Sequence, residues 1–175
     1  MKNLYIHLLF SQSGNKRIKS QLLGLLYALI FPLMLSNNVN AQTTSYYGLN
    51  LSELNGVIQN CIDLQALQQY YPLNTDGSLK QVNIRQYPIT FPAGTQLSKG
   101  GNVVNLLNAS ESTDALDAYF MFRSIETSQN TLTVKANYFY KDNSQMLKTV
   151  SVTINFQNAN SSWTISNFNL TGDTL

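Results

Sequence analysis

Apolar positions recur at helical spacing shortly after residue 48. One apolar helix face is predicted by steps of three, four, three and one along Leu51, Leu54, Ile58, Cys61 and Ile62. Asn50 and Glu53 have the spacing of a capping box at the start of this helix. A second short helix is predicted over Leu64–Tyr70, ended by Pro72 and capped by Asp63. We expect the apolar face to pack in the core.

Further along the chain, apolar and polar residues alternate with period two, which predicts strands. Residues 81–89 predict a strand with Pro88 near its end, and 103–107 predict either a strand or one helical turn. Four longer strands are predicted at 118–125, 131–140, 146–156 and 163–170. Turn-rich linkers of hairpin length join these four, so we expect a four-stranded antiparallel meander with one buried face.

A helix with one apolar face, followed by a sheet with one apolar face, predicts a two-layer α+β domain. We expect the N-terminal helix, or two short helices, to pack on a curved antiparallel sheet that ends in the meander. In the last strand the apolar positions shift from Trp163 and Ile165 to Phe168 and Leu170, which predicts a bulge or bend.

The order of these elements, together with the segment Ser-Ser-Trp-Thr-Ile-Ser-Asn at 161–167 after a turn, resembles small cystatin-like and NTF2-like domains. In those domains a curved sheet wraps a helix. The chain also resembles small exported bacterial proteins of unknown function with that shape. The resemblance spans roughly residues 50–170, and it carries no catalytic residue, because the histidine-dependent enzymes of the NTF2-like group need a side chain that this segment lacks.

The first part of the chain has the order of a secretory signal. A basic cluster at 16–19 precedes the uncharged run Leu22–Leu35, and small and polar residues follow up to Ala41. As a helix, the run would span about 21 Å, which is short of the ~30 Å hydrocarbon core. We therefore predict a signal peptide at 1–41, cleavage between Ala41 and Gln42, and one domain at 42–175. The alternative is an uncleaved signal-anchor.

Charge narrows the range of partners once the predicted leader is set aside. The remaining chain has seven Lys and Arg against nine Asp and Glu, a net charge of −2. A basic stripe for nucleic acid is therefore missing, and so is the attraction to anionic membranes. We expect an exported protein of the periplasm or the extracellular medium that meets the membrane only transiently, through its signal peptide.

Histidine is confined to the leader, as His7. The predicted domain therefore cannot build a Ser-His-Asp or Cys-His system, a histidine acid–base pair or a usual zinc site. The single cysteine, Cys61, lies on the apolar helix stripe, so we expect it to be buried. No cofactor, metal site or catalytic residue is predicted, although a carboxylate or tyrosine mechanism stays open.

These observations favour a non-enzymatic binding domain whose partner is an envelope protein or a glycan. Tyr46 and Tyr47 lie outside the regular elements and are the first contact candidates, because tyrosine combines a large rigid area with a polar tip. The alternative is a small-molecule pocket between helix and sheet, catalytic without histidine, with Asp117 as a base beside a phenol. The candidate lining residues of that pocket are Tyr70, Tyr119, Met121, Tyr138 and Trp163, with Arg123 as a charged anchor. A third hypothesis is an oligomeric surface component that pairs through an open sheet edge.

Overall fold

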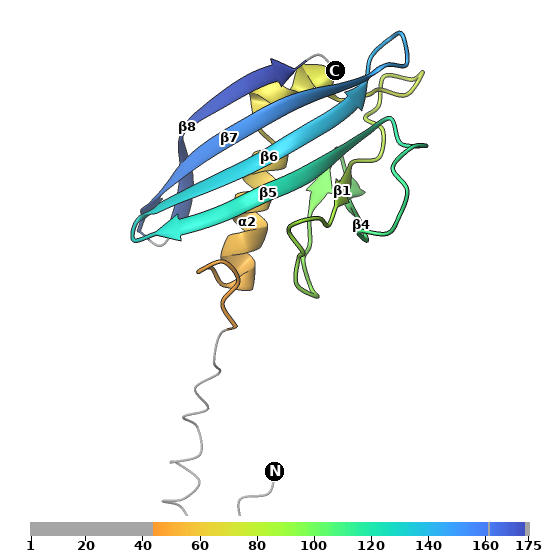
Figure 1. Cartoon of the computed structure of the whole chain (residues 1–175). Coiled ribbons are helices and arrows are strands. Elements are labelled where there is room, and N and C mark those ends of the chain that lie inside the picture. Colours follow the sequence, from red (N-terminus) through yellow and green to blue (C-terminus); the bar gives the residue numbers. More distant parts are fainter. Residues whose placement is uncertain (1–43, 161, 174–175) are drawn as a thin grey trace, which may run out of the picture. The chain divides into compact units, whose positions relative to one another are not determined.

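A helix and a six-stranded sheet form the two layers of this α+β fold (Figure 1). The computed structural model describes residues 44–160 and 162–173. The predicted signal peptide and its cleavage point between Ala41 and Gln42 lie outside these residues. Among the residues described, no helix is both long and apolar enough to cross a bilayer.

Helix α2 spans Leu51–Ile62, as its sequence spacing predicts. The capping box is present: the Asn50 side chain accepts from the backbone N–H of Glu53, and the Glu53 carboxylate accepts from that of Asn50. The apolar face is buried and consists of Leu54, Val57, Ile58, Cys61 and Ile62. Cys61 is a free buried thiol, which confirms the prediction for it.

The second helix, η1, is a 3₁₀ helix over Gln65–Tyr70. The prediction that Asp63 caps it is wrong, because its N-cap is Leu64 and no side chain caps it. Asp63 instead ends α2 as its C-cap, and its carboxylate binds the Lys99 ammonium at 2.7 Å.

The large sheet has the strand order β4-β1-β5-β6-β7-β8. Its strands are β1 (Asn83–Arg85), β4 (Asn105–Leu107), β5 (Ala118–Ser128), β6 (Thr131–Lys141), β7 (Leu147–Ala159) and β8 (Ser162–Asp173). A separate hairpin pairs β2 (Ser98–Lys99) with β3 (Asn102–Val103). Successive antiparallel pairings link β5, β6, β7 and β8.

The short strand β1 runs parallel to both of its neighbours, β4 and β5. The sheet is therefore mixed, whereas the sequence pattern predicts only antiparallel pairing. The buried amide of Asn83 joins these strands, since it donates to the Ala118 carbonyl and its oxygen accepts from Asn105. The region 103–107, for which a strand or a helical turn is predicted, contributes to β3 and β4.

Two irregularities interrupt the long antiparallel ladders. The register of β5 against β6 shifts between Phe122 and Ser124, and that of β7 against β8 shifts between Asn155 and Phe156. In β8 the extra residue is Ser166, so the apolar alternation changes phase there, as the sequence predicts.

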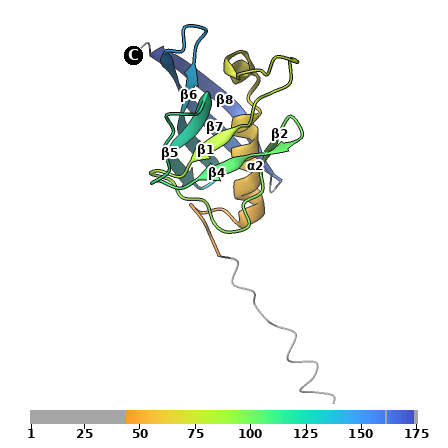
Figure 2. The same ribbon diagram turned by 90° about the vertical axis from the view of Figure 1, so that its right-hand side faces the viewer.

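One face of the sheet supplies its half of the core, and α2 supplies the other half. In Figure 2 the helix lies along one face of the sheet. The inward residues of β6 and β7 pair directly across the two strands, among them Val134 with Ile154 and Leu132 with Phe156. The β2–β3 hairpin is tied to α2, because the Gln59 side chain exchanges hydrogen bonds with the backbone of Ser98 in both directions.

Candidate functional site

The carboxylates of the described chain serve mainly structural roles. Glu53 caps α2, Asp63 binds Lys99, and Asp117 binds Lys80 at 2.7 Å. Asp76 accepts from the Ser78 side chain and backbone, which lowers the pKa of its carboxyl. Within residues 44–160 and 162–173, no three His, Cys, Asp or Glu side chains gather where they could hold a metal ion.

Tyr70 and Tyr138 belong to a cluster of packed rings at the η1 end of the core. Tyr138 is 1% exposed and lies 5.2 Å from Tyr71 and 4.6 Å from Phe120, centroid to centroid. Tyr70 lies 5.1 Å from Tyr140. The Tyr71 hydroxyl donates to the Ile62 carbonyl at 2.6 Å, and burial raises the pKa of Tyr71. These rings fill the helix–sheet interface at this end.

Tyr119, Met121 and Arg123 lie away from that cluster. Tyr119 and Met121 are on the outward face of β5, opposite the core residues Phe120 and Phe122. The Tyr119 ring stacks on Phe139 of β6, with centroids 4.8 Å apart. Arg123 is exposed at the bulge. The residues predicted to line one helix–sheet pocket are therefore divided between the two faces of the sheet.

The two tyrosines before α2 differ in their surroundings. Tyr46 is half-buried and packs against the core, while Tyr47 is 36% exposed. The hydroxyl of Tyr47 donates to the Thr90 carbonyl, and its own carbonyl accepts from Thr127. Gly48 follows with φ +79°, and a Cβ there would lie 3.2 Å from that of Thr127. Tyr47 therefore also fixes the turn that leads into α2.

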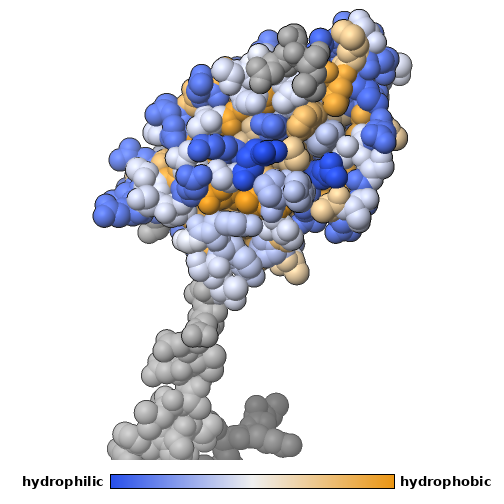
Figure 3. All heavy atoms as spheres, viewed as in Figure 1, coloured by the Kyte–Doolittle hydropathy of each residue, from blue (hydrophilic) through white to orange (hydrophobic). Residues whose placement is uncertain are grey.

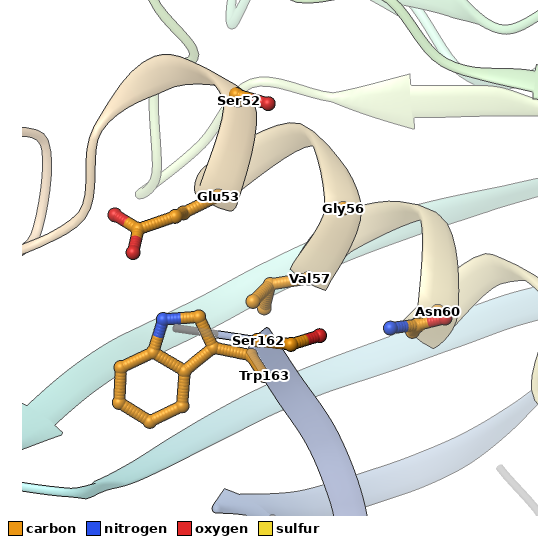
Figure 4. A pocket seen from close by; sticks show the side chains of 7 residues that line it. All are labelled: Ser52, Glu53, Gly56, Val57, Asn60, Ser162 and Trp163. Atoms are coloured by element: carbon orange, nitrogen blue, oxygen red, sulfur yellow. The ribbon is translucent and has the colours of Figure 1, made fainter. Parts of the chain in front are cut away.

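Trp163, the last predicted pocket residue, lies at a cleft between α2 and the start of β8 (Figure 4). The cleft has a volume of about 240 Å³. The helix side presents Ser52, Glu53, Gly56 and Asn60, and the sheet side presents Ser162 and the indole, with Val57 between them. We call this site the α2–β8 cleft.

The indole nitrogen of Trp163 lacks a hydrogen-bond partner among the described residues, although the side chain is only 9% exposed. An indole nitrogen only donates, and an unpaired buried donor costs about 1–3 kcal/mol. An unpaired, buried donor in a folded protein needs an explanation. A bound ligand that places an acceptor next to the Trp163 N–H would be such an explanation.

Sequence reasoning identified Trp163 but missed the helix side of the cleft. A signal was present, since Ser52, Gly56 and Asn60 recur at steps of four on the side of α2 away from its apolar face. That spacing places small and polar residues along one line of the helix surface.

The outward face of β7 and β8 is a second surface of unusual composition. From 151 to 157 on β7 and from 164 to 171 on β8, the outward positions carry only neutral hydrogen-bonding side chains. They are Ser151, Thr153, Asn155, Gln157, Thr164, Asn167, Asn169 and Thr171. We call this set the neutral face. A surface designed for solubility is given about 25–35% charged residues.

Side-chain hydrogen bonds order the middle of the neutral face. Thr133 of β6 donates to the Asn155 oxygen at 2.8 Å, and the Asn155 amide donates to the Asn167 oxygen at 2.6 Å. This ladder crosses three strands. Figure 3 views the sheet from this side and shows hydrophilic and intermediate residues with apolar patches between them.

Fold and surfaces together define a small α+β domain with a polar cleft on the helix side and a neutral polar surface on the opposite side of the sheet. No protein-family model, curated protein or solved structure matches this chain.

Proposed function

We propose that this chain is an exported, non-enzymatic binding domain of the cell envelope or the medium, and that its neutral face binds a glycan. The observation that carries the proposal is the neutral face itself, an ordered field of hydroxyl and amide groups without charge between residues 151–157 of β7 and 164–171 of β8.

Hydration explains why such a face suits a glycan. Charged side chains hold water strongly, and burying them against a neutral partner costs free energy. Neutral hydroxyls and amides lose less on desolvation, and they can exchange hydrogen bonds with sugar hydroxyls in both directions. The ladder through Thr133, Asn155 and Asn167 lowers the ordering cost further, because these side chains are already fixed.

An aromatic pair extends the surface beside the ladder. Tyr119 and Phe139 are stacked on the same side of the sheet as Thr133, and Phe139 pairs across the strands with Thr149. Tyr119 is buried and Phe139 is partly exposed, so the Phe139 ring, backed by Tyr119, offers the apolar face of a sugar ring a place to pack. We propose that a glycan follows the strands from this pair toward Asn167.

A non-enzymatic function is consistent with the structural contacts that the carboxylate groups make. Glu53, Asp63 and Asp117 are engaged in a helix cap or ion pairs, and Asp76 stabilises a turn. Asp117, considered as a base beside Tyr119, binds the Lys80 ammonium instead. Catalysis by a carboxylate pair needs two such groups facing one substrate.

We further propose that the sheet curves around α2 in the manner of cystatin-like and NTF2-like domains, with β5–β8 as its meander. The two register shifts support this, because a bulge bends the strand that carries it. Curvature of this kind closes the core on the α2 side and leaves the outward face of β7 and β8 open.

A glycan array tests the proposed function. Protein produced from the full-length sequence is applied to neutral, acidic and amino glycans, and proteins captured by crosslinking from the producing cells are identified in parallel. We expect retention on neutral glycans. A single stoichiometric protein partner, without retention on any neutral glycan, would replace this proposal with a protein-binding function.

A further inference from the structure

We propose that the α2–β8 cleft is a second binding site, which takes one neutral polyhydroxyl ring of the size of a monosaccharide. The cleft lies on the α2 side of the sheet, whereas the neutral face lies on the opposite side. The inference therefore does not depend on the function proposed for the neutral face.

The unpartnered donor of Trp163 is the first support. Figure 4 shows the indole beneath α2, with its nitrogen-bearing edge turned toward Glu53. This nitrogen is buried and has no acceptor among the described residues, and the side chain that carries it lines the cleft. A ligand oxygen in the cleft would supply that acceptor, since the indole N–H can only donate.

Gly56 is a second and independent support. Glycine in a helix interior is less favourable than alanine, so its presence needs a reason. Packing does not give one, because a Cβ built at Gly56 would meet no atom within 4 Å. The space above Gly56 belongs to the cleft, so the missing side chain keeps the helix side of the cleft open.

The polar groups of the cleft select a neutral ligand that both donates and accepts. Glu53 is the one ionisable residue among those lining the cleft. Its Oε2 already accepts from the Asn50 N–H at 2.9 Å, and it lies in the first turn of α2, where the helix dipole offsets negative charge. With no cation lining the cleft, an anion gains nothing there, while Ser52, Asn60 and Ser162 can exchange hydrogen bonds with hydroxyls.

Size sets the remaining limit. A volume of about 240 Å³ is below the range of about 300–1,000 Å³ usual for drug-sized ligands. It suits a single ring of a sugar, with Val57 and the indole as the apolar contacts. Both a free monosaccharide and the terminal unit of a glycan have this chemistry.

Trp163 is the only tryptophan of the chain, so its fluorescence reports on the cleft directly. Protein produced from the full-length sequence is titrated with glucose, galactose, mannose and N-acetylglucosamine, and with glucuronate as the anionic probe. We expect a saturable change with at least one neutral sugar and none with glucuronate. Trisaccharides of the responding sugar separate the sources: equal affinity indicates the free ring, and tighter binding indicates a chain end.

Two substitutions locate the response. Trp163→Phe keeps an aromatic ring but removes the donor, so affinity measured by ligand-observed NMR should fall by about tenfold, the effect of one lost hydrogen bond. Gly56→Ala should raise the midpoint of thermal unfolding and yet weaken binding, because its methyl group enters the cleft. Asn102→Lys, on the β2–β3 hairpin and outside both proposed sites, should leave the titration unchanged.

The site is overturned if no neutral sugar gives a saturable change, or if glucuronate alone does. It is also overturned if Gly56→Ala and Trp163→Phe both bind the responding sugar as the unmodified protein does. Should Trp163→Phe fail to fold, Gly56→Ala still decides the question, since that substitution is expected to stabilise the helix.

Discussion

Ionisable side chains that are buried and neutral distinguish the core of this protein. Burial raises the pKa of the Cys61 thiol, so the reactive thiolate is absent near neutral pH. Burial also raises the pKa of Tyr71 and of Tyr138, each with a smaller contribution from neighbouring groups. These groups stabilise the fold only while they stay protonated.

Cys61 should be inert in the folded protein. We expect no reaction with a thiol reagent near pH 8 under native conditions, and stoichiometric reaction once urea unfolds the chain. The rate of colour development with a disulfide reagent measures this. Rapid reaction without denaturant would contradict the buried position of Cys61 on α2.

Stability should decline in alkali. Because the pKa of Cys61 and of Tyr71 is raised by folding, their contribution is complete below the ordinary values of 9.0 and 10.0 and is lost as pH rises beyond them. The unfolded chain then releases protons that the folded chain retains, at up to about 1.4 kcal/mol per pH unit for each group. Urea unfolding across this range measures the slope.

A matched pair of variants identifies the groups responsible for the alkaline decline. Tyr71→Phe should lower stability at neutral pH by about 1 kcal/mol, through the lost hydrogen bond to Ile62, and should make the decline shallower. Phe120→Leu lowers stability without removing an ionisable group, so its slope should match that of the unmodified protein. Equal slopes in all three would show that Tyr71 does not contribute.

Helix α2 begins where its capping box places it, and the box can be tested as a unit. Asn50→Ala should lower the free energy of unfolding by about 1 kcal/mol, because the Glu53 N–H loses its acceptor. Asn50→Asp keeps an acceptor and should have little effect. Urea unfolding with an unchanged m-value would measure this, while equal stability of Asn50→Ala and Asn50→Asp would contradict the cap.

The local sequence pattern predicted the helices and strands better than it predicted which of them contact each other. The spacing of apolar residues located α2, and the change of phase after Ile165 located the bulge in β8, because both depend on neighbours in sequence. The parallel pairing of β1 with β4 and β5 depends on contacts between distant segments, which periodicity does not record. Asp63 was assigned to the wrong helix for a related reason, since its partner Lys99 is 36 residues away.

The candidate site shows the same limit. Alternation in β5 and β6 indicates two faces but not which of them a helix covers, so Tyr138 and Tyr119 were placed in one pocket although they face opposite sides. Trp163 does line a cleft, while its neighbours there on α2 became visible only through the packing of β8 against that helix.

Salt dependence follows from the composition of the whole surface. If binding occurs through the neutral face, few ions are released or screened, so the affinity for a neutral glycan should change by less than about twofold between low and high salt. Isothermal titration calorimetry at two ionic strengths measures this. A steep loss of affinity with salt would indicate contact through charged residues instead.

The measurement that tests the central claim most directly compares two lysine substitutions on the same glycan array. Asn155→Lys places a charge in the middle of the neutral face and breaks the ladder to Asn167, whereas Asn102→Lys adds the same charge on the β2–β3 hairpin. Both substitutions are made in the Trp163→Phe protein, whose cleft is weakened. We predict that Asn155→Lys loses retention on neutral glycans while Asn102→Lys keeps it, with both variants folded by thermal unfolding. Equal retention of the two variants would contradict the assignment of the neutral face as the binding surface.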